Sequence, residues 1–127
     1  MIEQRGLADV RMRVLVADDE VAIVEVLTFI LVEAGFDVLS AFTGPEALEV
    51  ARRERPDLIL LDVMMPGLDG REVSRRLKDG AETSRIPVML ISALSVDLAA
   101  SGADAYLAKP FDVDALVHQA ERLTRTA

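Results

Sequence analysis

The chain has 127 residues, no cysteine, one histidine and a formal net charge of −8. This length suits one domain with its own core, and the lack of cysteine excludes disulfide and thiol chemistry. The negative charge argues against a surface that binds nucleic acid or anionic membranes by itself. No apolar run approaches the ~20 residues of a membrane span. We expect a cytoplasmic protein with no secretion signal, an N-terminal extension over residues 1–12 and a domain over 13–127.

Apolar runs bounded by glycine and proline predict five strands that alternate with five helical stretches. The strands are expected at residues 14–17, 36–41, 58–61, 87–91 and 105–107, and the helical stretches at 21–34, 44–53, 70–78, 95–101 and 113–124. Short, continuous apolar strands are typical of a parallel sheet that is buried on both faces. The alternation therefore predicts an α/β fold, a doubly wound five-stranded parallel sheet with right-handed crossovers.

The first helical stretch is apolar along most of its length. We expect its inward stripe to consist of Ile23, Leu27, Ile30 and Ala34, with Gly35 ending the helix. That phase leaves three large apolar residues on the outer side, namely Val24, Phe29 and Val32.

Polar residues stand where four of the predicted strands end. Asp62 directly follows the third strand, and the run Asp18-Asp19-Glu20 follows the first. Ser92 and Lys109 end the fourth and fifth strands. In the strand order 2-1-3-4-5, the first and third strands are neighbours at the topological switch point, where ligands bind. The sequence therefore predicts that Asp18, Asp19 and Asp62 converge on one crevice, with Ser92 and Lys109 at its border.

Three neighbouring carboxylates repel one another unless a cation compensates their charge. Oxygen ligands of this kind favour Mg²⁺, and a lysine can bind a phosphoryl oxygen. A carboxylate beside Mg²⁺ can attack phosphorus and form an aspartyl phosphate. Each residue also has a simpler explanation, since aspartates often form turns or helix N-caps. Their coincidence at four strand ends favours a phosphoryl-transfer site.

Four motifs in this order resemble the receiver domain of two-component response regulators. They are VLVADDE, LILLDVMMPGLDG, PVMLISA and GADAYLAKPF, and the resemblance extends from about Arg13 to Arg125. It implies a flavodoxin-like sheet of order 2-1-3-4-5. It also implies a receiver that takes a phosphoryl group from a phosphohistidine on a sensor histidine kinase or phosphotransfer protein. Such a chain is not an enzyme beyond its own phosphorylation and slow dephosphorylation.

The resemblance also assigns a role to single residues. Asp62 is the implied phosphoacceptor, and Asp19 is the implied direct ligand of Mg²⁺. Asp18 would act on the ion mainly through water, and the carbonyl of Met64 would supply a further ligand. The residues implied in phosphate binding and switching are Ser92 as the switch hydroxyl, Ala93 as the small residue beside it, Lys109 as the phosphate contact, and Tyr106 as the aromatic that turns inward.

The segment from Ser92 to Gly102 departs from the family pattern. It is about five residues shorter than usual, which is more than one helical turn. The fold is therefore expected to have a shortened fourth helix.

The outer side of the first helix is the expected partner surface. In the family this helix docks on the helical bundle that carries the donor histidine. We therefore expect Val24, Phe29 and Val32 to contact the phosphodonor protein or a second copy of the chain, as in a homodimer.

Three other functions compete with this interpretation. A Mg²⁺-dependent phosphohydrolase lacks a general acid two residues after Asp62, where Met64 stands. A flavodoxin-like nucleotide binder would need a phosphate loop after the first strand, but acids stand there. The third is a receiver fragment of a larger regulator or hybrid histidine kinase, which the sequence leaves open.

Overall fold

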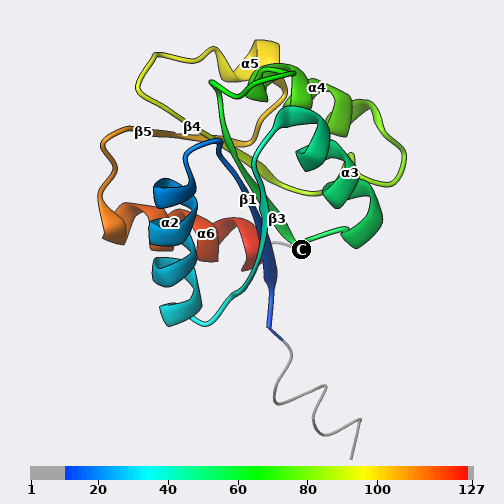
Figure 1. Cartoon of the computed structure of the whole chain (residues 1–127). Coiled ribbons are helices and arrows are strands. Elements are labelled where there is room, and N and C mark those ends of the chain that lie inside the picture. The colour runs from blue at the N-terminus through cyan, green and yellow to red at the C-terminus, as the bar shows by residue number, and fades with distance from the viewer. Residues whose placement is uncertain (1–10, 126–127) are drawn as a thin grey trace, which may run out of the picture.

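The computed structural model describes residues 11–125, which form a parallel sheet covered by helices on both faces (Figure 1). The strand order is β2-β1-β3-β4-β5, which confirms the predicted topology. The strands are β1 (Arg13–Ala17), β2 (Asp37–Ala41), β3 (Leu58–Asp62), β4 (Val88–Ser92) and β5 (Ala105–Ala108). The extension predicted for residues 1–12 falls largely outside the described residues.

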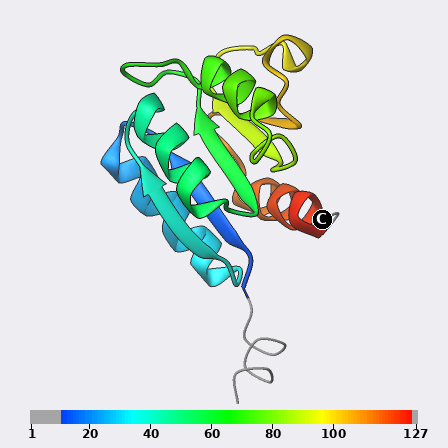
Figure 2. The same cartoon turned by 90° about the vertical axis from the view of Figure 1, so that its right-hand side faces the viewer.

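Within the described residues, four helices connect consecutive strands and a fifth follows β5, close to the predicted stretches. They are α2 (Val21–Glu33), α3 (Gly44–Glu54), α4 (Gly70–Asp79), α5 (Leu98–Ser101) and α6 (Val113–Arg125). Figures 1 and 2 show α2 and α6 on one face of the sheet and α3 and α4 on the other. Within residues 11–125, no helix combines the length and the apolar character that crossing a bilayer requires.

Alternating side chains of the central strands divide the core into two layers. Leu15 and Leu61 pack with the residues of α3 and α4, whereas Val16 and Leu60 pack with those of α2 and α6. All four side chains are essentially inaccessible to solvent. Burial on both faces explains why these strands are continuous apolar runs without alternation.

Helix α2 corrects one prediction, because its inward face is rotated from the expected one. Its buried residues are Val24, Leu27 and Leu31, and Val24 is only 4% exposed. The prediction that Val24 lies on the outer side was therefore wrong. Apolar residues occupy almost every position of this helix, so its sequence carries little directional information about which face is buried.

Two local features position the chain around the end of β3. Thr43 caps α3, since Glu46 N donates to Thr43 Oγ1 over 3.1 Å, and the Glu46 side chain reaches back to accept from Phe42 N over 2.7 Å. At the start of α4, a Cβ on Gly70 would lie 2.2 Å from the carbonyl oxygen of Asp62. Only glycine lets this helix approach the end of β3 so closely.

The predicted shortening of the fourth helix is confirmed. Helix α5 has four residues, begins after Asp97, and ends at Gly102 with a φ of +73°. Near the end of α4, Lys78 Nζ donates to Asp104 Oδ2 over 2.7 Å, and the same oxygen accepts from Val88 N over 2.9 Å. These bonds link α4 to the beginning of β4 and to the turn that enters β5.

The first prediction concerns Ser74, a fully buried residue of α4. Among the side chains of residues 11–125, its Oγ is the buried polar atom without a hydrogen-bond partner. Because a buried unpaired hydroxyl costs about 1 kcal/mol or more, Ser74→Ala should raise the free energy of unfolding by about 1 kcal/mol. Urea denaturation monitored by circular dichroism measures this change.

Ser101 provides the matched control for this prediction. It is equally buried, but its Oγ donates to Leu98 O over 3.0 Å and accepts from Ala103 N over 3.2 Å. Ser101→Ala should therefore lower stability by about 1 kcal/mol. Equal losses in both variants would show that the Ser74 hydroxyl has a partner in solution.

Candidate functional site

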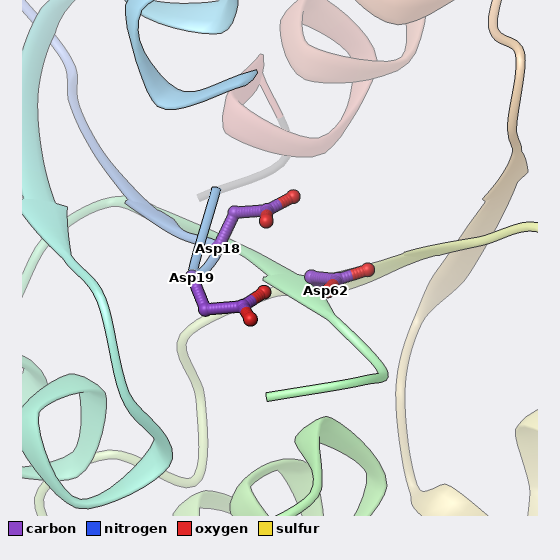
Figure 3. Close-up of side chains that lie close together, drawn as sticks. All are labelled: Asp18, Asp19 and Asp62. Carbon is purple, nitrogen blue, oxygen red and sulfur yellow. The ribbon is translucent and has the colours of Figure 1, made fainter. Parts of the chain in front are cut away.

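Three aspartates meet where β1 and β3 end. Asp18 and Asp19 directly follow β1, and Asp62 is the last residue of β3. The two strands are neighbours with Ala17 opposite Leu61, so their ends coincide. One oxygen from each carboxylate lies within 4.8 Å of the others, and Figure 3 shows the side chains extending into the same space. The predicted convergence is therefore confirmed.

Lys109 reaches this cluster from the end of β5. Its Nζ donates to Asp18 Oδ2 and to Asp62 Oδ1, each over 3.1 Å. Its backbone N–H donates to the carbonyl oxygen of Ser92 over 2.9 Å, which fixes the start of the loop after β5. The lysine ammonium thus lies between two buried carboxylates as an internal counter-charge.

The electrostatic environment shifts the pKa values of two groups in the cluster. Burial raises the pKa of Asp62, and repulsion by Asp18 adds to that effect, while the hydrogen bond from Lys109 opposes it. For Lys109, burial alone would lower the pKa, but the hydrogen bonds to Asp62 and Asp18 raise it overall. Asp62 is therefore harder to ionise than an ordinary aspartate, and a further cation would relieve that cost.

The acidic run after β1 does not serve simply to cap α2. Glu20 occupies the N-cap position but makes no capping bond through its side chain. Asp18 Oδ1 accepts from Glu20 N over 2.9 Å, which orients the buried Asp18 carboxylate, whereas Asp19 is exposed. The cluster offers hard carboxylate oxygens from three side chains, a donor set that fits Mg²⁺.

A pocket of about 350 Å³ opens above the cluster. Its lining consists of Asp19, Glu20, Asp62, Met64, Ser92, Ala93, Leu94 and Lys109. The sequence predicted six of these residues, but not Glu20 and Leu94, as part of the site. Glu20 belongs to the acidic run, which could have indicated it, whereas no sequence signal marks Leu94. Met64 and Leu94 are 62% and 55% exposed and form apolar parts of the pocket wall.

Ser92 and Tyr106 together hold the loop that follows β4. The Ser92 hydroxyl is buried and accepts a hydrogen bond from Leu94 N over 3.0 Å. Tyr106 Oη shares its single proton between Leu94 O at 2.8 Å and Ser92 O at 3.0 Å. Tyr106 is outside the lining of the pocket, yet its hydroxyl fastens the same loop. Movement of Ser92 would therefore disturb the bond that Leu94 makes to it.

Of the three residues predicted as a partner surface, two are accessible. Phe29 is 69% exposed and Val32 is 44% exposed, whereas Val24 belongs to the core. Helix α2 begins at Val21, directly after the pocket residue Glu20. The exposed side of α2 is therefore continuous with the rim of the pocket.

Comparisons with known proteins agree with this geometry. The family model of the response regulator receiver domain matches residues 14–121. Response regulator PleD from Caulobacter vibrioides is 46% identical over 118 residues, which cover 89% of this chain and 26% of PleD. The chain thus spans about a quarter of the length of that relative.

Solved structures give the same result. The receiver domain of a Francisella response regulator superposes with a TM-score of 0.84 and 35% identity, covering 91% of this chain and 98% of that one. The receiver domain of the sensor histidine kinase PA1611 from Pseudomonas aeruginosa PAO1 has a TM-score of 0.84 and 28% identity, with the same coverage, and holds a magnesium ion in its active site cleft. The chain belongs to the response regulator receiver domain family of two-component signalling.

Proposed function

We propose that this receiver accepts a phosphoryl group on Asp62 from a phosphohistidine of a sensor histidine kinase or phosphotransfer protein. The observation that carries the proposal is the buried Asp62 carboxylate, which contacts Lys109 and lies beside Asp18 and Asp19. In the transfer, a carboxylate oxygen of Asp62 forms a bond to phosphorus while the P–N bond of the donor breaks. The donor imidazole, protonated on its other nitrogen, leaves as neutral histidine.

The same carboxylates would hold the Mg²⁺ that this chemistry requires. Asp19 and Asp62 are the proposed direct ligands, together with the carbonyl of Met64, and the buried Asp18 acts mainly through water. Asp18 already bonds Lys109 and Glu20 N, whereas Asp19 is exposed toward the pocket, which supports this division. When bound, the ion supplies positive charge that screens the incoming phosphoryl oxygens.

Four other residues respond to the phosphoryl group in this proposal. Lys109 binds one of its oxygens, and Ala93 leaves room for it within the pocket. The Ser92 hydroxyl donates to it and so gives up its bond with Leu94 N. Tyr106, whose hydroxyl bonds Leu94 O and Ser92 O, then gives up these bonds and turns inward.

The aspartyl phosphate is expected to be hydrolysed slowly. Met64 and Leu94, both apolar, flank Asp62 in the pocket and offer no general base to activate water. We therefore propose that the chain catalyses only its own phosphorylation and a slow loss of the group. A role as a phosphohydrolase is not favoured.

The donor is proposed to contact α2 through Phe29 and Val32. Both side chains are exposed, and the helix begins beside the pocket. Val24 is not part of this proposed contact surface, because its side chain is buried in the core.

A receiver within a larger regulator or hybrid histidine kinase is the second candidate. The chain covers only 26% of PleD, and one structural neighbour is the receiver of a sensor kinase. The chemistry proposed for Asp62 is the same in either case.

The second prediction identifies the phosphorylation site. Acetyl phosphate with Mg²⁺ should add one phosphoryl group to the wild type and none to Asp62→Asn, as measured by intact mass. Chelation of Mg²⁺ should abolish labelling, because Lys109 alone leaves the three carboxylates with a net negative charge that repels the phosphoryl oxygens. Asp79→Asn is the matched control, since Asp79 is exposed on α4, away from the pocket. A phosphoryl group on Asp62→Asn would refute the assignment.

The third prediction follows from the raised pKa of Asp62. Between its ordinary pKa of 3.8 and the higher native value, the folded state binds more protons than the unfolded state. The wild type therefore loses stability as the pH rises through this window. Without Mg²⁺, Asp62→Asn should be more stable than the wild type at pH 7, and the difference should shrink as the pH falls toward 3.8.

Asp69 supplies a control of opposite sign for the pH experiment. The hydrogen bond from Arg71 lowers the pKa of Asp69, so its ionised form stabilises the fold at neutral pH. Asp69→Asn should therefore be less stable than the wild type at pH 7, with a difference that shrinks in acid. Urea denaturation at several pH values measures both variants, and a stability change of the same sign in both at pH 7 would contradict the explanation.

The fourth prediction tests the donor surface. Phe29→Glu should slow transfer from the cognate phosphohistidine protein by about tenfold or more, because a charge replaces an apolar anchor. Labelling by acetyl phosphate needs no docking and should stay at the wild-type rate. Met12→Glu is the control, because Met12 is an exposed apolar residue at the opposite end of β1. Equal slowing of both reactions would place Phe29 in the fold rather than in the interface.

A further inference from the structure

Helix α2 exposes more apolar surface than a helix at the outside of a domain usually does. In addition to its buried residues, Val21, Val26, Phe29 and Val32 are 44–69% exposed. A helix that is apolar on nearly all sides is normally covered on nearly all sides. One side of α2 is therefore available to a partner.

A groove of about 560 Å³ runs between this side of α2 and the edge strand β2. Its lining consists of Val21, Val24, Glu25, Thr28, Phe29, Val32, Ser40 and Phe42. Figure 2 shows β2 and α2 side by side along one edge of the molecule. Ser40 is paired with Val16, whose side chain faces α2, so this small residue lies on the floor of the groove. Phe42 stands at its far wall, directly after β2.

The charge around this groove is negative and is not balanced by nearby basic residues in the sequence. From Val14 to Ala51 the chain has eight acidic residues and no lysine or arginine. Glu25 lines the groove, and none of the ion pairs found within the described part of the chain involves it. An occupant with basic residues flanking an apolar stripe would complement this surface, whereas a second copy would bring like charges together.

The shape of the groove favours a helix as the occupant. Its apolar wall extends along α2 from Val21 to Val32, a length of about 16 Å at 1.5 Å per residue. This length accommodates about three turns of a docked helix with apolar anchors at positions i, i+3 or i+4, and i+7. We propose that the α2–β2 groove binds an amphipathic helix of a partner protein that carries lysine or arginine beside its apolar stripe.

The inference deepens the proposed function, because the groove begins at Val21, next to the pocket residue Glu20. It adds Ser40 and Phe42 to the surface and defines the chemistry of the partner. A helix in this groove would lie close to the acidic pocket. Its binding, however, does not depend on the phosphorylation of Asp62, so the two proposals can fail separately.

The test uses three fluorescent synthetic peptides of 14 residues, measured by anisotropy against the full chain. The first has a leucine stripe with lysines on both sides, the second has glutamate in place of lysine, and the third has the composition of the first with the stripe scrambled. Only the first should bind well, and its affinity should fall as salt rises. Equal binding of the scrambled peptide would reduce the effect to net charge and overturn the proposal, as would equal binding of the glutamate peptide.

Two variants locate the site of binding. Phe42→Ala removes the far wall, and Ser40→Arg fills the floor and adds a positive charge that repels the lysines, so each should lower the affinity for the first peptide by about tenfold or more. Both residues are exposed, and circular dichroism confirms that the variants fold. Val113→Ala is the matched control, because Val113 is an exposed apolar residue of α6 outside the groove and should leave affinity unchanged. Unchanged affinity in the two groove variants would overturn the proposal.

Two further measurements separate the alternatives. Sedimentation velocity tests whether the groove holds a second copy, and a dimer that Phe42→Ala dissociates would overturn the proposed occupant. Labelling of the wild type by acetyl phosphate is measured in parallel. Peptide binding without labelling would refute the phosphoacceptor proposal alone, and labelling without peptide binding would refute the groove proposal alone.

Discussion

The pairing of β1 with β3 in the middle of the sheet is the constraint on which the site depends. Both strands are buried on both faces, so a shift of register by one residue would turn apolar side chains to the wrong layer. The register that satisfies the core also places the end of β1 beside the end of β3. The closeness of Asp18, Asp19 and Asp62 is therefore maintained by hydrophobic packing against their mutual repulsion.

Lys109 offsets part of the repulsion among these carboxylates. It comes from the far edge of the sheet, more than forty residues after Asp62, and its position depends on the pairing of β4 with β5. Its ammonium group contacts one carboxylate of β3 and one that follows β1. The acidic site and the outer strands of the sheet are thus electrostatically coupled.

Much of this arrangement was predictable because its signals are local. Apolar runs that end in an acid at Asp62 and at Asp18 mark strands and a shared edge, and the structure brings these residues together with Ser92 and Lys109 as expected. Their roles in phosphoryl transfer stay predictions. The phase of α2 was not predictable, because valine, isoleucine and leucine occupy so many positions that Val24 and Ile23 look equally suited to the core. The bonds of Tyr106 to the loop after Ser92 depend on tertiary structure alone and leave no mark in the sequence.

The internal lysine also determines what a partner can detect. With all groups ionised, three carboxylates and one ammonium carry a net charge of −2, which a divalent cation cancels. A phosphoryl group brings roughly −1.5 to −2 in place of the single charge on Asp62. The pocket then changes by only about one charge on a chain of −8, and salt screens such a change within about 8 Å. A distant partner surface would therefore sense the geometry of the Ser92–Leu94 loop rather than the electric field of the phosphate.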